Sequence, residues 1–199
     1  TVEDFSRGIV EGLDAFLSDN RLTSELVSEI IHGTTVATNA ILQNQGVRTA
    51  LVTTRGFRDV LEFRRLRFPD LFSLDYTPPK PLVPRRQRFE VIERIMHDGS
   101  IRQPLDDRSV ESVLEKLEQV QPEAIAICLL HSYANPIHER KVVEAVKNRF
   151  PNLYVSGSID VLPEIREYER TSTTVINSYI GPIVDNYLKS MQKRLDHAN

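Results

Sequence analysis

The residues best suited to chemistry lie at positions 30–40, where the sequence reads Ile-Ile-His-Gly-Thr-Thr-Val-Ala-Thr-Asn-Ala. The apolar pair at the start is typical of the end of a buried strand, and the apolar residues after Thr35 follow helical spacing. The sequence therefore predicts a strand, a short polar turn and the start of a helix. Because the first N–H groups of a helix lack intrahelical acceptors, such a turn could bind an anion or a polarised oxygen.

The composition of this turn favours a binding site over a simple helix cap. Gly33 has no side chain, so a ligand could approach the backbone closely there. The alternative is that Thr34, Thr35 and Thr38 only cap the helix, since Thr is a common N-cap residue. One cap accounts for one hydroxyl group and leaves the other polar residues in the row unexplained.

Length and composition are those of a globular protein. The chain has 199 residues, of which 40% are hydrophobic and 27% are charged, and it can bury a sizeable core. The net charge of −3 gives no electrostatic reason to expect binding to nucleic acid or to an anionic membrane. No apolar run approaches the ~20 residues of a membrane span. Because the first residue is Thr rather than Met, the chain is expected to be a piece of a longer one.

Several familiar kinds of site have no signature in the sequence. Cys128 is the single cysteine and lies in an apolar run, where a small core residue is expected; this fits a reducing, cytoplasmic location. The five histidines lack the spacing of metal ligands, so no metal site is predicted. Neither a G-x-S-x-G elbow nor a phosphate-binding glycine fingerprint occurs.

The elements that would position the polar turn alternate between helices and strands. A second strand ends in another polar turn, Thr53–Gly56. Two successive strand–turn–helix units predict a parallel sheet, with ligand crevices at the carboxyl ends of its strands. In this half of the chain, helices are expected at residues 3–18, 36–45 and 57–63, and strands at residues 29–32 and 48–53.

The middle of the chain contains five prolines between positions 69 and 84. This density is incompatible with a helix or a central strand and predicts an extended crossing. Asp98-Gly99 lies between two strand-like runs and predicts a β-hairpin. The sequence therefore predicts a small β-rich insertion, residues 69–105, in an α/β lobe with parallel strands formed by residues 1–68 and 106–199.

Two clusters of arginines, at positions 64–67 and 85–88, flank the proline-rich stretch. With a negative net charge, a solvated basic face is a better interpretation than a nucleic-acid site. For a small anionic ligand, binding and simple solvation both stay open.

The last third returns to alternating helices and strands, so the predicted fold class is α/β. The run at 124–130 is apolar throughout, as expected of a strand covered on both faces. Gly181-Pro182 lies inside the last helix and is expected to kink or split it. Helices are expected at residues 106–120 and 136–150 and from residue 169 onward, and strands at residues 124–130 and 153–158.

A second stretch with possible function opens this last helix. Residues 163–174 read Pro-Glu-Ile-Arg-Glu-Tyr-Glu-Arg-Thr-Ser-Thr-Thr, which places hydroxyl groups at a helix start behind alternating acids and arginines. A cap with local ion pairs, worth tenths of a kcal/mol each, accounts for this pattern when it is taken alone.

Five blocks of the sequence closely resemble the hydantoinase/oxoprolinase family. They occur in the family's order and cover most of the chain. The resemblance is to the N-terminal region of the A-type subunit of N-methylhydantoinases, ATP-dependent 5-oxoprolinases and the related acetone carboxylases. The blocks are residues 32–40, 50–62, 81–85, 128–136 and 163–174.

The resemblance implies a fold and exposes a departure. The family looks like the actin/hexokinase-like (ribonuclease H-like) ATPases, which would make this chain an incomplete first lobe. Family members begin with a strand and a glycine-rich D-x-G-G-T phosphate loop, and no such motif precedes His32 here. The chain by itself is therefore expected not to turn over ATP.

The implied reaction is ATP-dependent opening of a hydantoin or 5-oxoproline ring by phosphorylation of the carbonyl oxygen, with Mg²⁺ at the phosphates. A B-type hydantoinase subunit or a further copy of the chain is the expected partner. The alternatives are an ATP-dependent ketone carboxylase subunit, a kinase of the same superfamily and a non-catalytic docking module.

The resemblance also assigns roles to particular residues. Gly33, Thr34 and Thr35 would be catalytic, because they would present N–H and hydroxyl donors to the developing oxyanion or the moving phosphoryl group. The residues expected to bind substrate or nucleotide are His32, Thr38, Asn39, Arg55, Arg58, Glu164, Arg166, Glu169 and Arg170.

Overall fold

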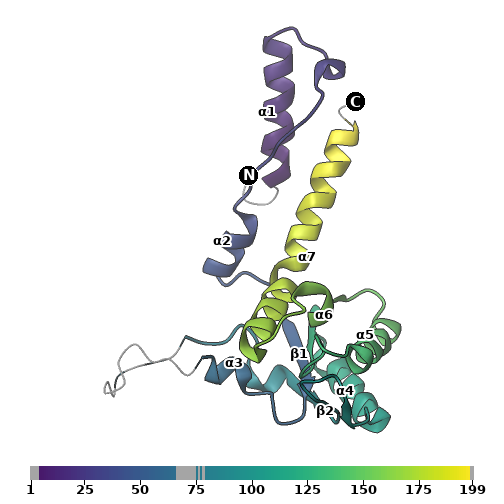
Figure 1. The fold of residues 1–199 in the computed structure, drawn as a ribbon. Coiled ribbons are helices and arrows are strands. Elements are labelled where there is room, and N and C mark those ends of the chain that lie inside the picture. The colour runs from purple at the N-terminus through teal and green to yellow at the C-terminus, as the bar shows by residue number, and fades with distance from the viewer. Residues whose placement is uncertain (1–4, 66–74, 76, 78, 198–199) are drawn as a thin grey trace. The chain divides into compact units, whose positions relative to one another are not determined.

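The computed structural model describes residues 5–65, 75, 77 and 79–197 (Figure 1). The chain divides into two compact units. Unit 1 comprises residues 1–46 and 180–199, and unit 2 comprises residues 47–179. Among the described residues, none of the helices is both long enough and apolar enough to cross a membrane.

Unit 2 is built on a four-stranded parallel sheet with the strand order β2-β1-β5-β6. All six residues of β1 are buried, and so are all five of β5, which is the pattern of strands covered on both faces. The predicted α/β fold with a parallel sheet is thereby confirmed. The strands are β1 (Thr49–Thr54), β2 (Arg88–Val91), β5 (Ala124–Cys128) and β6 (Tyr154–Gly157).

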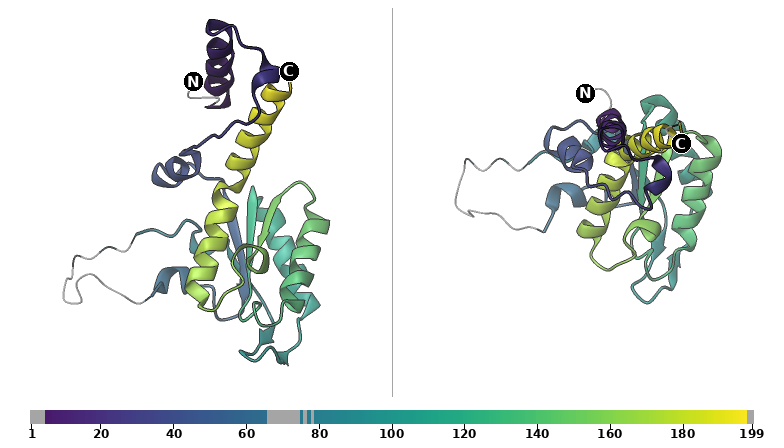
Figure 2. Two further views of the ribbon diagram at one scale, coloured as in Figure 1. Left: turned by 45° about the horizontal axis from the view of Figure 1, so that its top comes forward. Right: turned by 90° about the horizontal axis from the view of Figure 1, so that it is seen from above.

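Alternate residues of the strands build two separate cores, because successive side chains point to opposite faces of a sheet. Val52 and Ile127 pack with the apolar faces of α4 (Asp107–Val120) and α5 (Ile137–Arg149). Leu51 and Ala126 pack on the other face with Leu61 of α3 (Val60–Phe63) and Val175 of α7 (Glu167–His197). The sheet therefore lies between two layers of helices (Figures 1 and 2).

The predicted hairpin is present, but only part of its first strand belongs to it. β3 (Arg94–Ile95) pairs antiparallel with β4 (Ile101–Gln103) around Gly99, whose φ of +83° favours glycine. The preceding β2 instead extends the central parallel sheet. Most of the proline-rich crossing lies outside the described residues, and the domain boundaries expected from the sequence stay a prediction.

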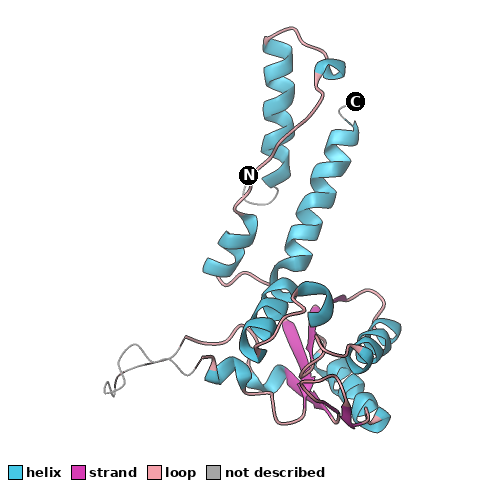
Figure 3. Cartoon of the chain, viewed as in Figure 1, coloured by secondary structure: helices cyan, strands magenta, loops and turns pink. Residues whose placement is uncertain are grey.

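Unit 1 contains α1 (Phe5–Asp19), the short 3₁₀ helix η1 (Ser24–Leu26), α2 (Val36–Leu42) and the second part of α7. The strand predicted at residues 29–32 is wrong. This segment is an exposed loop (Figure 3), because no strand of the described part of unit 1 offers it the backbone partners that a strand requires. Of the two outcomes predicted at Gly181-Pro182, a split does not occur, since α7 continues through Pro182, and the kink stays a prediction.

The chain enters and leaves unit 2 at neighbouring points. The backbone N–H of Val47 donates to the carbonyl oxygen of Tyr179 at 3.0 Å. Val47 and Tyr179 are the first and last residues of unit 2. The residue ranges show that unit 2 is one continuous piece of chain, whereas unit 1 is made from two separate pieces.

Candidate functional site

A cluster of buried polar residues lies beyond the carboxyl ends of the parallel strands in unit 2. In parallel sheets this edge is where ligands are usually bound. Each member is less than 5% exposed to solvent. We call this set the polar cluster, and its members are Thr54, Glu93, Ser132, His138, Glu139, Ser158 and Arg170.

Arg170, in the first turns of α7, connects the strand ends to that helix. Its Nη2 donates to the carbonyl oxygen of Leu129 at 2.7 Å. Its Nη1 donates to the hydroxyl groups of Ser132 and Ser158, and its guanidinium lies over the ring of Tyr133 at 5.5 Å. Hydrogen bonds of this kind, with a charged donor, are stronger than neutral ones.

Glu139, in the first turn of α5, is the buried acid of the cluster. Its carboxylate accepts hydrogen bonds from the backbone N–H groups of Leu129 at 2.7 Å and Ile159 at 2.9 Å. The Ser158 hydroxyl donates to the same carboxylate at 2.9 Å. Burial raises the pKa of Glu139, and these hydrogen bonds oppose the rise. Ser158 thus links the buried acid to Arg170.

A second chain of polar contacts joins Thr54, Glu93 and His138. The Thr54 hydroxyl donates to the Glu93 carboxylate and accepts from the backbone N–H of Leu130 at 2.9 Å. The other oxygen of Glu93 lies 2.9 Å from Nδ1 of His138. Because the hydroxyl contacts the carboxylate rather than the imidazole, this group lacks the nucleophile–base contact of a catalytic triad.

The polar cluster is buried and has little open space beside it. A cavity of about 10 Å³ beside Cys128, Arg170 and Thr171 matches the space of about one water molecule. Among the described residues, no group of three His, Cys, Asp or Glu side chains gathers to hold a metal ion. The cluster therefore positions the strand ends and the start of α7.

The predicted turn of unit 1 is exposed, in contrast to the polar cluster. Every residue from His32 to Thr35 is exposed, as are Thr38 and Asn39. The Thr34 hydroxyl accepts from the backbone N–H of Val36 at 3.3 Å, and the Thr35 hydroxyl accepts from the Asn39 amide at 3.2 Å. The structure thus brings Thr34, Thr35 and Asn39 together.

Two further observations concern the partner of His32 and the space around Gly33. His32 Nε2 is hydrogen-bonded to the hydroxyl of Tyr187, on the second part of α7. A Cβ atom built onto Gly33 would meet no atom within 4 Å. Among the described residues, therefore, no neighbouring atom lies so close to Gly33 that a side chain at this position would clash with it.

The predicted site residues of unit 2 are dispersed. Arg55 and Arg58 follow β1 and line a basic pocket beside β2. Glu164 and Arg166 are exposed, whereas Glu169 forms an ion pair with Arg65. Of the predicted residues, only Arg170 belongs to the polar cluster.

Sequence reasoning missed most of the polar cluster, although one signal was present. Glu139 occupies the same helix face as Val142, Val143 and Val146, at spacings of three, four and seven residues. A charged residue in line with an apolar face is a candidate for burial. Glu93 and Ser158 carry no comparable pattern.

Comparison with known proteins identifies relatives over most of the sequence. Residues 1–150 match the family described as the hydantoinase/oxoprolinase N-terminal region. An uncharacterised protein of Methanocaldococcus jannaschii is 44% identical over 85% of this chain and 25% of its own length. The caprolactamase alpha subunit of Pseudomonas jessenii is 36% identical over 92% of this chain and 26% of its own length. The chain spans about a quarter of the length of these relatives.

Two solved structures contain the same fold. An ATP-dependent caprolactamase from Pseudomonas jessenii matches 100% of this chain with a TM-score of 0.90 and 33% identity. A nucleotide-free acetone carboxylase matches 100% of the chain with a TM-score of 0.87 and 25% identity. In each case the match covers 30% of the other chain.

Arg170 is expected to be essential for stability, because its removal leaves the buried Glu139 carboxylate without a compensating charge. The Arg170→Met variant should lower the free energy of unfolding by about 3 kcal/mol or more. Urea titration followed by circular dichroism measures this. The exposed Arg166→Met variant is the matched control and should change stability by less than about 0.5 kcal/mol; equal effects of both would contradict the assignment.

Cys128 is expected to be unreactive in the folded chain. The side chain is buried, with its sulfur 3.2 Å from the Thr171 hydroxyl, and burial raises the pKa of the thiol. Because the thiolate is the reactive form, a thiol reagent at pH 7 should modify Cys128 only after unfolding in urea. Rapid labelling of the native chain would refute this expectation.

Proposed function

This chain belongs to the hydantoinase/oxoprolinase family, and from that membership we propose that it is part of an ATP-dependent enzyme that opens a cyclic amide ring. One observation carries the proposal: the whole chain superposes on an ATP-dependent caprolactamase at 33% identity. A lactam is itself a cyclic amide. Hydantoin and 5-oxoproline are the substrates that we propose for the complete protein.

The chemical difficulty is the low reactivity of an amide carbonyl toward water. ATP would phosphorylate the carbonyl oxygen, with Mg²⁺ at the phosphates, and this would make the carbonyl carbon electrophilic enough for water to attack. The ring C–N bond would then break, and phosphate would be released. The fold expected of such an ATPase is a lobe of the actin/hexokinase-like type. A B-type subunit or a second copy of the chain would be the partner of the complete protein.

The exposed turn of unit 1 is the part of this chain that we propose to act in the reaction. The hydroxyl oxygens of Thr34 and Thr35 both accept hydrogen bonds from within the turn. Their protons have no acceptor among the described residues, and they are available to an incoming anion. With the backbone N–H of Gly33, they would stabilise charge that develops on the carbonyl or phosphoryl oxygens.

The other residues would support this turn or the ligand. Tyr187 holds His32, and Asn39 holds Thr35. The remaining candidates keep the binding or supporting roles that the family resemblance implies; they are Thr38, Arg55, Arg58, Glu164, Arg166, Glu169 and Arg170.

The Thr35→Ala variant of the complete protein is expected to lower kcat by about 10²-fold, because it removes one donor to the developing charge. Steady-state phosphate release measures this. Thr35→Ser keeps the hydroxyl group and should restore most of the rate. Thr23→Ala, at another exposed threonine of unit 1, is the matched control. A normal kcat for Thr35→Ala would remove the turn from the mechanism.

The substrate is tested by phosphate release from Mg-ATP with the complete protein, in the presence and absence of hydantoin, N-methylhydantoin and 5-oxoproline. Release that rises with one ring, together with the opened ring as product, supports the proposal. A stable phosphorylated compound would indicate a kinase instead. No stimulation by any ring, with or without a B-type subunit, would overturn ring opening.

The second candidate is a subunit of an ATP-dependent ketone carboxylase. It is favoured by the likeness to acetone carboxylase over the whole chain. Phosphate release that depends on both a ketone and bicarbonate, and on no cyclic amide, would establish it. A docking module would give a tight complex with a partner that is insensitive to any of these ligands.

A further inference from the structure

A basic pocket of about 600 Å³ lies in unit 2, beside the edge strand β2 and the start of α4. Its lining includes two carboxylates, those of Glu90 and Asp106, and a larger number of cations. The volume falls within the range of small-molecule pockets. The cations are Arg55, Arg58, Arg86, Arg88, Arg108 and Lys116.

Both carboxylates of the basic pocket are already engaged by the protein. Glu90 accepts a hydrogen bond from the backbone N–H of Gly56 at 2.7 Å and lies 3.9 Å from Nη1 of Arg58. Asp106 accepts from the backbone N–H of Arg108 at 3.0 Å, which caps α4. These acids therefore offset only part of the positive charge.

One of the six cations has a structural role. The side chain of Arg88 is fully buried, and it donates to the backbone carbonyls of Val83 and Arg58 and to the Glu62 carboxylate. These partners satisfy all of its nitrogens. Arg88 thus shapes the wall of the pocket and is not available to a ligand.

The side chains of the other cations are largely unpaired. Those of Arg55, Arg86, Arg108 and Lys116 are exposed and have no hydrogen bond or ion pair with any described residue. Arg58 is partly paired, because its Nη2 donates to the carbonyl oxygen of Arg85 at 3.2 Å and its Nη1 lies 3.9 Å from Glu90, whereas its buried Nε has no partner among the described residues. Like charges held around one concave surface repel one another, and a ligand with several negative charges would relieve that repulsion.

We propose that the basic pocket binds a small anion that carries two or more phosphate groups. Guanidinium groups match the geometry of phosphate oxygens, and several of them converge here. A monocarboxylate would neutralise only one of the unpaired cations. The pocket is concave and the protein has a net charge of −3, which argues against an extended nucleic acid as the ligand. The inference does not depend on the proposed ring-opening reaction.

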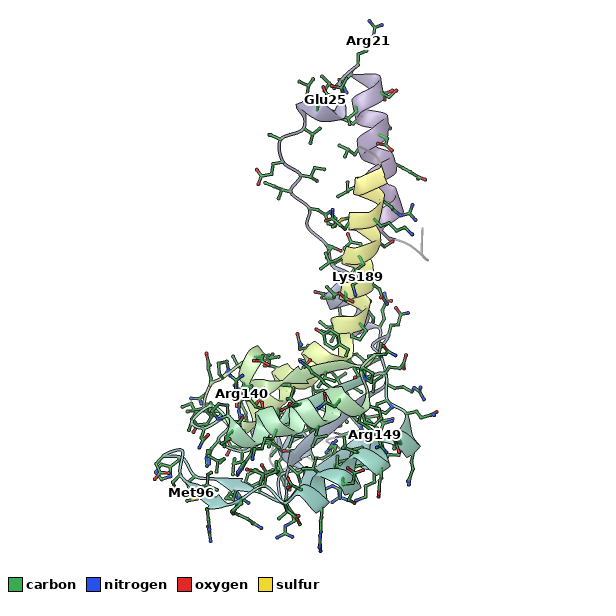
Figure 4. The ribbon with its side chains drawn as sticks, turned by 90° about the vertical axis from the view of Figure 1, so that its right-hand side faces the viewer. Arg21, Glu25, Met96, Arg140, Arg149 and Lys189 are labelled. Atoms are coloured by element: carbon green, nitrogen blue, oxygen red, sulfur yellow. The ribbon has the colours of Figure 1, made fainter. Side chains whose placement is uncertain are left out.

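The experiment is a calorimetric titration of the 199-residue chain with pyrophosphate, in the absence of ATP and amide. The Arg86→Gln/Lys116→Gln variant removes two exposed cations of the pocket and should weaken binding about tenfold or more. The control is Arg140→Gln/Lys147→Gln, which makes the same charge change on α5, away from the pocket lining (Figure 4 labels Arg140). The control should bind as the unmodified chain does.

Three results would overturn the proposal. In the first, the unmodified chain does not bind pyrophosphate at millimolar concentration. In the second, the two variants lose affinity for pyrophosphate equally. In the third, the unmodified chain binds citrate as tightly as pyrophosphate. The last would show attraction to charge alone. Because neither ATP nor a cyclic amide is present, failure here leaves the proposed reaction untouched, and failure of ring opening leaves this pocket untouched.

Discussion

The arrangement of unit 2 depends on two opposite charges that are buried together, the guanidinium of Arg170 and the carboxylate of Glu139. Neither charge would be tolerated alone in this environment, because desolvation of an ion costs several kcal/mol. Ser158 contacts both, and the backbone around Leu129 contacts both. The ends of β5 and β6, the first turn of α5 and the start of α7 are therefore held in one geometry. A network of this kind favours a single arrangement over alternatives in which any member loses its partner.

The polar cluster and the exposed turn differ in their access to solvent. The cluster is buried, and its hydrogen bonds are made within the protein, although Nε of Arg170 has no partner among the described residues. The hydroxyl groups of the turn keep protons with no acceptor among the described residues. We propose that the buried cluster maintains the fold and that the exposed turn acts on the ligand.

The pattern of apolar and turn-forming residues predicts the parts of the fold that depend on residues close together in the sequence. The apolar run at 124–130 predicts a strand covered on both faces, and all five residues of β5 are buried. Asp98-Gly99 predicts a hairpin, which β3 and β4 form. The strand predicted at residues 29–32 failed, because an apolar pattern cannot supply the neighbouring strand that backbone groups need. The link between Glu139 and Arg170 through Ser158 could not be predicted from sequence, since it depends on how α5 and α7 pack at the strand ends. The basic pocket was partly predicted, because the arginine cluster at 85–88 and the predicted residues Arg55 and Arg58 contribute to its lining, but its joining of these cations with Arg108 and Lys116 depends on how separate segments pack.

The hydrogen bond between Val47 and Tyr179 bears on the order in which the chain folds. The two pieces of unit 1 are separated along the chain by the whole of unit 2, and bringing them together from a random coil would carry the entropy cost of closing a very long loop. Once unit 2 has folded, its ends lie side by side and that loop is already closed. Assembly of unit 1 then becomes a nearly local event. A chain organised in this way gains speed when its inserted unit folds first.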